Sequence, residues 1–402
     1  PYTTLFRSYL FVGSKFGDYK FPGGGVKKDE PITTAMIREV QEETGYEVIE
    51  ESVKIYREVI EKRKGMIEDL LEQTSHYFYC DIYPEQGKRN LDVYEQEYDY
   101  QVRWLTLEEA IERNEAFNNY KMCPWVIRDT IVMKTLLKED FLYKKIFPNI
   151  PNKMKEMIEH RTFQVDTVGC EGSFIYIFDN NLVLKVCDKS AEYQMLKWLK
   201  GKLSVPDVAD FYEDEKYHYI LMEKMPGKPT FGFGFLSNYN KAAEVFVRGL
   251  KSLWSVDIKE CPFVVNLDFK LKKAKERIDN NLINIADFEP ETIENYKNPG
   301  KLWEYLYHNR PEEELVFVHG DFCLPNMFAE NDEITGFIDV GRSGVGDKWQ
   351  DIALLLRSVK HNLDNIGEGK LFPKFFEAFF KELNIKPDLD KIKYYILLDE
   401  LF

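Results

Sequence analysis

The spacing of apolar and polar residues divides the chain into two patterned regions. In the first region, we expect strands where apolar and polar positions alternate and helices where apolar residues recur every three to four positions. The expected strands cover residues 9–12, 53–60, 76–83 and 101–105, and the expected helices cover residues 33–44, a segment from Leu107, and residues 131–146. Gly45 follows the first helix and suits the left-handed residue that often ends one.

Two prolines and two asparagines within residues 148–152 interrupt this pattern and predict a linker. Beyond the linker the pattern starts again with a short helix. It then predicts strands at residues 162–168, 174–178, 182–187 and 217–222, a helix at 191–199, and mostly helix from about residue 241, apart from 316–326 and 334–339. The restart of the pattern predicts a second domain.

Composition and charge narrow the classes of function. Apolar residues make up 44% of the 402 residues and aromatic residues 15%, which is enough for sizeable cores and excludes a largely disordered chain. No apolar run reaches the ~18 residues that a transmembrane helix needs, so no membrane partner is expected. The chain has 54 basic and 69 acidic residues, a net charge of −15. Such a surface repels nucleic acids and suits a cationic small substrate.

The cysteines and the first residues bear on location and processing. The six cysteines show neither zinc-site spacing nor a dense disulfide framework, so we expect a reducing, cytoplasmic location. Residues 1–8, PYTTLFRS, lack an initiating Met and read like a translated sequencing adapter. We interpret them as such a remnant, with the native N-terminus missing. The alternative is a genuine short strand.

Residues 24–46 combine glycines with regularly spaced charges. Glu39, Glu42 and Glu43 share one face of the expected helix. Their mutual repulsion is unfavourable unless a cation neutralises it, and carboxylate oxygens suit Mg²⁺ or Mn²⁺. Arg38 can hold one of these carboxylates in place. The alternative is a solvated acidic helix face.

This run resembles the Nudix box. The matching positions are Gly24, Glu30, Arg38, Glu39, Glu42, Glu43 and Gly45, whereas Tyr46 departs from an aliphatic position. The resemblance implies an α/β/α sandwich that hydrolyses a nucleoside diphosphate linked to another group. It implies that Glu39, Glu42 and Glu43 hold Mg²⁺ or Mn²⁺, and that Glu43, another of these carboxylates or one from a later loop activates water. The alternative is an inactive Nudix fold.

A second set of polar residues lies at the ends of apolar strands. Asp321 follows one such strand, Asn326 comes five positions later, and Asp339 ends another strand. ATP-dependent phosphoryl transfer uses one carboxylate to accept the hydroxyl proton, and an Asn and a second Asp to hold Mg²⁺. Lys185 on an earlier strand and Glu192 at the start of the next helix complete a kinase-like set.

Two further features surround this set. The glycine-containing turn at residues 169–173 can lay backbone N–H groups over phosphates. His319 directly precedes Gly320 and Asp321, and we expect it to brace the loop and not to bind metal.

Residues from about 150 to 402 resemble aminoglycoside phosphotransferases, most of all the 3′-phosphotransferases. The resemblance rests on His319-Gly320-Asp321 through Asn326, residues 336–358 and residues 385–402, and the C-terminus looks intact by this comparison. It implies an α+β, bilobal, protein-kinase-like domain, with a small lobe at about 153–222 and a large lobe at about 228–402.

The same resemblance assigns expected roles. Asp321 would be the catalytic base, Asn326 and Asp339 would bind Mg²⁺, and Lys185 with Glu192 would form the phosphate-binding pair. Ser173 would lie over the phosphates of ATP, Met222 and Glu223 would contact adenine at the hinge, and Arg342, Asp399, Glu400 and Phe402 would border the acceptor cleft.

The sequence thus predicts a Nudix-like domain at residues 9–147 that lacks its N-terminal start, a linker at 148–152 and a kinase-like domain at 153–402. The expected activity is ATP-dependent phosphorylation of an aminoglycoside antibiotic at its 3′-hydroxyl, which confers resistance. One alternative is a kinase for another small hydroxylated metabolite. The other is a Nudix pyrophosphohydrolase whose kinase-like domain only binds a ligand. The antibiotic range, the Nudix substrate and the preference for ATP or GTP stay open.

Overall fold

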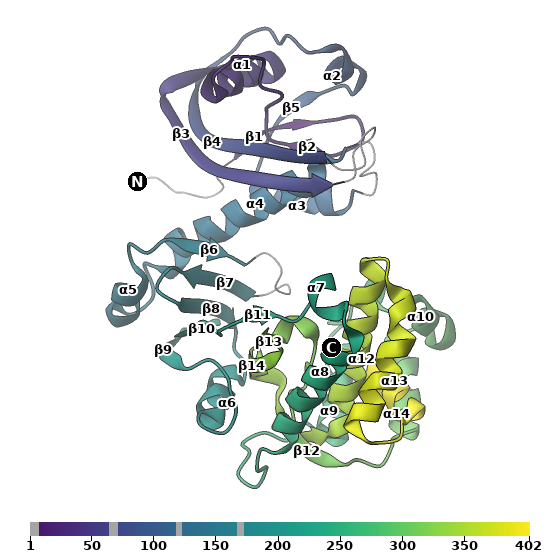
Figure 1. The fold of residues 1–402 in the computed structure, drawn as a ribbon. Helices are drawn as coiled ribbons and strands as arrows, with labels where there is room; N and C mark the ends of the chain where they lie inside the picture. Colours follow the sequence, from purple (N-terminus) through teal and green to yellow (C-terminus); the bar gives the residue numbers. More distant parts are fainter. Residues whose placement is uncertain (1–7, 64–70, 118–122, 167–172) are drawn as a thin grey trace. The chain divides into compact units, whose positions relative to one another are not determined.

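A computed structural model describes residues 8–63, 71–117, 123–166 and 173–402 (Figure 1). The chain forms two compact units, Pro1–Asn149 and Ile150–Phe402. Within the residues that the structure describes, no helix is both long and apolar enough to cross a membrane.

The N-terminal unit combines a small antiparallel sheet with a long two-stranded ribbon. In the sheet, β1 (Tyr9–Gly13) lies between β2 (Tyr19–Lys20) and β5 (Gln101–Leu105). The ribbon pairs β3 (Tyr46–Arg63) with β4 (Leu71–Gln86), and both strands run well beyond the predicted residues 53–60 and 76–83. Exposed apolar residues such as Ile55 and Ile60, together with irregular register, break the alternation that would have marked the full strands.

Helices cover this sheet and ribbon. They are α1 (Ile32–Thr44), α2 (Val93–Glu97), α3 (Leu107–Glu115) and α4 (Trp125–Phe141). Gly45 has a φ of 77° and ends α1 as predicted. The helix predicted at residues 131–146 begins earlier, at Trp125, and its last turn widens into the π-helix η1 (Leu142–Ile146). Phe11, Leu107, Ile111, Val132 and Met133 form part of the buried core.

The proline- and asparagine-rich segment lies at the boundary between the units. Residues 147–149 form a turn, in which the Asn149 N–H donates to the Ile146 carbonyl. Pro151 then precedes α5 (Asn152–Ile158), where a proline at the helix start has no N–H to leave unpaired.

The C-terminal unit begins with a five-stranded antiparallel sheet of order β6-β7-β8-β10-β9. Its elements are β6 (Phe163–Val165), β7 (Ser173–Phe178), β8 (Leu182–Asp188), α6 (Glu192–Leu199), β9 (Val208–Glu213) and β10 (Tyr217–Glu223). The sequence analysis did not predict β9. This strand lies at the sheet edge and is only partly buried on either side, so it shows no clear alternation. Part of the predicted turn at residues 169–173 lies outside the described residues.

The rest of this unit is mostly helical (Figure 1). Its helices are α7 (Phe233–Leu236), α8 (Tyr239–Trp254), α9 (Leu267–Asp279), α10 (Pro290–Tyr296), α11 (Pro299–His308), α12 (Lys348–Asn365), α13 (Phe372–Leu383) and α14 (Leu389–Asp399), with the 3₁₀ turns η2 (Ile285–Asp287), η3 (Leu324–Asn326), η4 (Val340–Arg342) and η5 (Gly369–Leu371). Two small sheets complete it: β11 (Lys228–Pro229), β13 (Met327–Glu330) and β14 (Glu333–Phe337) form one, and β12 (Leu315–Val318) and β15 (Gly344–Asp347) form the other.

These small sheets position the polar loops. Asp321 follows β12, Asn326 directly precedes β13, and Asp339 lies between β14 and η4. Behind them, a large apolar core joins α8, α12, α13 and α14, with Phe246 and Phe375 in ring contact. The polar residues therefore sit on short loops held by a buried scaffold.

Candidate functional sites

Three buried carboxylates meet in the N-terminal unit. Glu39 and Glu43 come from α1 and Glu95 comes from α2, and each offers an oxygen within 4.8 Å of the others. Three carboxylate oxygens at this spacing are a donor set that suits a hard divalent cation, which would also relieve their mutual repulsion. The residues present therefore fit the Mg²⁺ or Mn²⁺ that the Nudix box implies.

Glu43 is the most enclosed of the three. Its side chain is fully buried, accepts a hydrogen bond from the Gly23 N–H at 2.9 Å and lies 2.6 Å from the Lys20 ammonium. Burial raises the pKa of the Glu43 carboxyl to about 7, although Lys20 opposes this and Glu95 adds to it. Burial thus favours the protonated form of this carboxyl.

Arg38 bonds to three carboxylates of the motif. Its guanidinium donates to Glu30 at 2.9 and 3.0 Å, to Glu39 at 2.7 Å and to Glu42 at 2.8 Å. The hydrogen bond from Arg38 lowers the pKa of Glu30 to about 2. Glu42 is partly exposed and is not one of the three clustered carboxylates among the described residues, and its role as a metal ligand stays a prediction.

The sequence analysis did not predict Glu95, which comes from α2 and joins the cluster. It also caps α2, where its carboxylate accepts the Asp92 N–H at 2.7 Å, and it accepts the Tyr94 hydroxyl at 3.0 Å. The Asp-x-x-Glu spacing signals a helix start in the sequence. It does not reveal that this Glu faces α1.

The requirement for glycine at the first position of the Nudix box is steric. A β-carbon at Gly24 would lie 2.5 Å from the Glu39 Oε2, and Arg38 holds that carboxylate. Any side chain at this position would displace a residue of the cluster.

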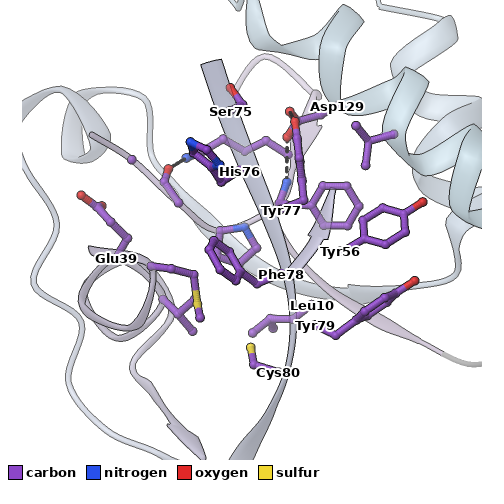
Figure 2. A pocket seen from close by; sticks show the side chains of 18 of the residues that line it. Leu10, Glu39, Tyr56, Ser75, His76, Tyr77, Phe78, Tyr79, Cys80 and Asp129 are labelled. Atoms are coloured by element: carbon purple, nitrogen blue, oxygen red, sulfur yellow. Dashed lines mark hydrogen bonds between the residues drawn. The ribbon is translucent and has the colours of Figure 1, made fainter. Parts of the chain in front are cut away.

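A cavity of about 990 Å³ adjoins the carboxylates (Figure 2). Glu39 lies on one side of it, and Tyr56, Tyr77 and Asp129 lie on the other. Asp129 accepts the Tyr77 hydroxyl at 2.7 Å and the Phe21 N–H at 3.0 Å, so partly buried hydrogen bonds fix this far wall. The volume is at the upper end of the range for small-molecule sites, about 300–1,000 Å³.

In the C-terminal unit, Lys185 lies between two carboxylates. β8 carries Lys185, whose ammonium is 2.6 Å from Glu192 on α6 and 2.7 Å from Asp339. Burial raises the pKa of the Glu192 carboxyl. Burial acts in the same direction on Asp339, but the neighbouring Lys185 outweighs it and lowers the pKa of Asp339. The structure thus brings together three residues that lie up to 154 positions apart.

Asp321 and Asn326 form the second part of this site. The Asn326 amide donates to the Asp321 Oδ2 at 3.0 Å and to its carbonyl at 3.1 Å. His319 is buried, and its ring contacts the Ile338 carbonyl at 2.9 Å and accepts the Asp321 N–H at 3.3 Å. The prediction that His319 braces the loop is confirmed.

Asp339 and Asp321 share a neighbourhood. Asp339 has a φ of 59°, a left-handed conformation that is uncommon for a residue with a side chain. Burial raises the pKa of the nearby Cys323 thiol, and Asp321 and Asp339 both add to it. The Asp339 carboxylate and the Asn326 amide oxygen are hard donors of the kind that Mg²⁺ prefers, so these residues fit the predicted ion.

The residues predicted to contact ATP lie at the ends of strands β7 and β10. Ser173 is partly buried and opens β7, and Met222 is buried near the end of β10. Glu223 ends β10, exposed, and its N–H donates to the Asp207 carbonyl at 2.9 Å.

The residues predicted to border the acceptor form hydrogen bonds within the C-terminal unit, except Arg342. Asp399 accepts a hydrogen bond from Arg357, and the Thr292 hydroxyl donates to Glu400 at 2.8 Å. The main-chain oxygen of Phe402 accepts from Arg277 at 3.0 Å, whereas Arg342 is exposed on η4. The structure gives Asp399, Glu400 and Phe402 fixed positions on and after α14.

Comparisons with known proteins agree with the two sites. Residues 157–395 match the model of the phosphotransferase enzyme family, APH, and residues 4–126 match that of the NUDIX domain. An aminoglycoside 3′-phosphotransferase from Enterococcus faecalis is 36% identical over 266 residues, covering 63% of this chain and 98% of the relative. One from Staphylococcus aureus is 35% identical over 265 residues, covering 63% and 98%.

Solved structures show the fold of the C-terminal unit. An aminoglycoside-3′-phosphotransferase of type VIII matches 62% of this chain and 97% of its own with a TM-score of 0.54 and 24% identity. The aminoglycoside phosphotransferase APH(3″)-Id from Streptomyces rimosus, in complex with ADP and streptomycin, matches 62% of this chain and 95% of its own with a TM-score of 0.53 and 21% identity. The C-terminal unit therefore has the kinase-like fold of these phosphotransferases.

Proposed function

Because the chain belongs to the phosphotransferase enzyme family, we propose that its C-terminal unit transfers the γ-phosphoryl group of ATP to the 3′-hydroxyl of an aminoglycoside. The observation that carries this proposal is the joint placement of Lys185, Glu192 and Asp339 next to the Asp321–Asn326 pair. The named activity of its relatives in Enterococcus faecalis and Staphylococcus aureus supports the acceptor class. The phosphoryl group adds negative charge to the antibiotic. This charge would weaken the binding of the antibiotic to its target and so confer resistance.

Each residue has a proposed task. Asp321 accepts the proton of the attacking hydroxyl, and Lys185, oriented by Glu192, contacts the phosphates of ATP. Ser173 lies over those phosphates, and Met222 and Glu223 contact adenine. Asn326 and Asp339 would hold Mg²⁺, which when bound neutralises charge on the phosphates. Arg342, Asp399, Glu400 and Phe402 border the acceptor.

For the N-terminal unit we propose hydrolysis of a nucleoside diphosphate derivative in the cavity beside the carboxylates. Glu39, Glu43 and Glu95 would hold Mg²⁺ or Mn²⁺, which when bound supplies an acidified water. Glu43 is also the proposed base. The Nudix α/β/α arrangement is supported by α1, which contacts β3 and β5, and by α3 and α4, which contact β2.

The kinase proposal is tested by ADP release from the full chain with ATP, Mg²⁺ and kanamycin. Asp321→Asn is expected to abolish the kanamycin-dependent rate without changing the unfolding temperature. Asp332→Asn, in the exposed turn between β13 and β14, is the matched control. Equal turnover by wild type and Asp321→Asn contradicts the assigned base. No turnover with any aminoglycoside, from protein that binds ATP, points to another small hydroxylated acceptor.

The hydrolase proposal is tested with Mn²⁺ and a panel of nucleoside diphosphate derivatives. Glu43→Gln and Glu95→Gln are expected to abolish hydrolysis, whereas Glu42→Gln reduces it less because Glu42 lies outside the cluster of described carboxylates. Glu47→Gln, exposed on β3, is the control. A larger loss from Glu42→Gln than from Glu95→Gln contradicts the proposed ligand set.

A further inference from the structure

One arginine on α9 holds the residues that follow α14. The Arg277 Nε donates to the Leu401 carbonyl at 3.0 Å. Its Nη2 donates to the main-chain oxygen of Phe402 at 3.0 Å and to the Leu282 carbonyl at 3.1 Å. Leu401 and Phe402 lie 124 and 125 positions away in the sequence, and the Leu401 side chain is fully buried. Three of the five N–H groups of the guanidinium are thus used by carbonyl oxygens, two of them after α14.

The positions of two helix ends explain why a cation is stable here. Arg277 lies in the last turn of α9, and Leu401 follows the last residue of α14. Carbonyl groups at the C-terminal end of a helix lack partners within the helix and carry partial negative charge, which attracts a cation. A cap for α9 alone accounts only for the bond to Leu282. The bonds to Leu401 and Phe402 join two helix ends, a task that suits a rigid fork of donors.

Two other helices contact residues 399–402, which include three of the four groups proposed to border the acceptor. Arg357 on α12 donates a hydrogen bond to Asp399. Thr292 on α10 donates its hydroxyl to Glu400 at 2.8 Å. Together with the bonds from α9, three helices therefore fix the place of this segment.

Helix α12 also links this segment to the loop that carries the proposed base. Arg357 contacts Asp399, and the next residue, Ser358, accepts the Leu324 N–H at 3.1 Å. Leu324 begins η3, three positions after Asp321. Consecutive residues of one helix thus connect the segment with the Asp321 loop. A shift of the segment would change where the acceptor lies relative to the proposed base.

We propose that Arg277 is a positioning residue for the acceptor: it holds residues 399–402 on α9 and so keeps their acceptor-side groups in place relative to Asp321. The inference rests on the proposed function of the C-terminal unit. Arg277 acts through the segment that it holds, so its loss weakens the use of the acceptor and leaves the use of ATP nearly unchanged.

The kinetic test compares the full chain with Arg277→Met, which removes the donors, and with Arg277→Lys, which keeps the charge without the fork. Lys272→Met, exposed on α9, removes one positive charge from the same helix and is the matched control. Arg277→Met is expected to lower kcat/KM for kanamycin about 10- to 100-fold, mainly through KM. The KM for ATP should change less than about two-fold. Arg277→Lys should lose less than Arg277→Met.

Amide hydrogen exchange measures the hold on the segment without any substrate. The N–H groups of Leu401 and Phe402 donate to the carbonyls of Leu398 and Asp399. In Arg277→Met, these two amides are expected to exchange at least about 10-fold faster, because the segment opens locally. The amides of α13 and of Lys272→Met should exchange as in wild type.

The proposal is overturned if Arg277→Met keeps the wild-type KM for kanamycin, if its KM for ATP rises in parallel, or if exchange in residues 399–402 is unchanged. Equal effects in Lys272→Met would assign the loss to charge and also overturn it. If Arg277→Met does not fold, Arg277→Lys decides by the same comparisons. If wild type phosphorylates no aminoglycoside, the proposed function fails. Exchange then still decides whether Arg277 holds the segment, and unchanged exchange refutes it.

Discussion

Replacing Lys185 by Met tests the charge arrangement behind the proposed ATP site. The substitution keeps the length of the side chain and removes the ammonium that lies 2.6 Å from Glu192 and 2.7 Å from Asp339. Glu192 is 3% exposed, so it cannot recover its lost partner from water. Asp339 is about half exposed at its side chain and can be hydrated.

The size of the expected destabilisation follows from this difference in exposure between Glu192 and Asp339. Removing one partner of a buried ion pair costs about 3–5 kcal/mol, which corresponds to a fall of roughly 6–20 °C in the unfolding temperature of a unit of this size. Glu192→Gln leaves Lys185 paired with Asp339 and should cost only about 1–2 kcal/mol. The double variant should cost about 1–3 kcal/mol less than the sum of the two single variants because the same interaction is lost in both.

The assay is calorimetry of the full chain. The unfolding transition whose temperature rises when ATP is added belongs to the C-terminal unit. Lys189→Met, exposed after β8, is the matched control and should leave the transition in place. The rate with limiting ATP should fall with Lys185→Met and not with the control. Single-variant losses that add up in the double variant, or an unmoved transition in Lys185→Met, would refute the reasoning.

Three further predictions concern the other buried groups. Because a carboxylate must lose its proton to bind a metal, the Glu43 pKa of about 7 predicts that Mn²⁺ binding releases about one proton at pH ~6 and almost none at pH ~8. Calorimetric titration in buffers of different ionisation enthalpy measures the number of protons released. Glu43→Gln should abolish the difference in proton release between the two pH values. Gly45→Ala should destabilise the N-terminal unit by about 1–3 kcal/mol, because φ is 77° and a β-carbon would lie 2.6 Å from a carbonyl oxygen; Gly25→Ala, with open space around it, is the control, and equal unfolding temperatures would contradict the argument. Tyr395→Phe removes a 2.7 Å hydrogen bond to the buried Asp347 and should lower the free energy of unfolding by about 1–3 kcal/mol in urea titrations; an unchanged value would show that Asp347 finds another donor.

The two chemical motifs were readable from the sequence because their geometry is local. Residues one helical turn apart share a face, which placed Glu39 and Glu43 together on α1. Strand ends and tight loops placed Asp321 and Asn326 within hydrogen-bond distance of each other. The ends of several helices and strands were harder to predict from the sequence. The ribbon strands β3 and β4 extend well beyond the predicted residues because exposed apolar side chains interrupt their alternation.

Tertiary structure decided which distant residues complete each site. Glu95 joins Glu39 and Glu43 because the segment before α2 runs beside the end of α1, where the Asn90 N–H donates to the Glu42 carbonyl at 2.8 Å. No spacing rule links residues on separate helices.

Tertiary packing also decided which polar side chains are buried. Lys270 is one of several lysines on α9, and it is 7% exposed because tertiary packing places its ammonium 5.2 Å from the centroid of the Phe402 ring. The sequence by itself determined the chemistry of the two motifs, since neighbours along a helix or loop meet in any fold that keeps that element. The partners of that chemistry, and the pKa values that burial shifts, depend on contacts between segments far apart in the chain.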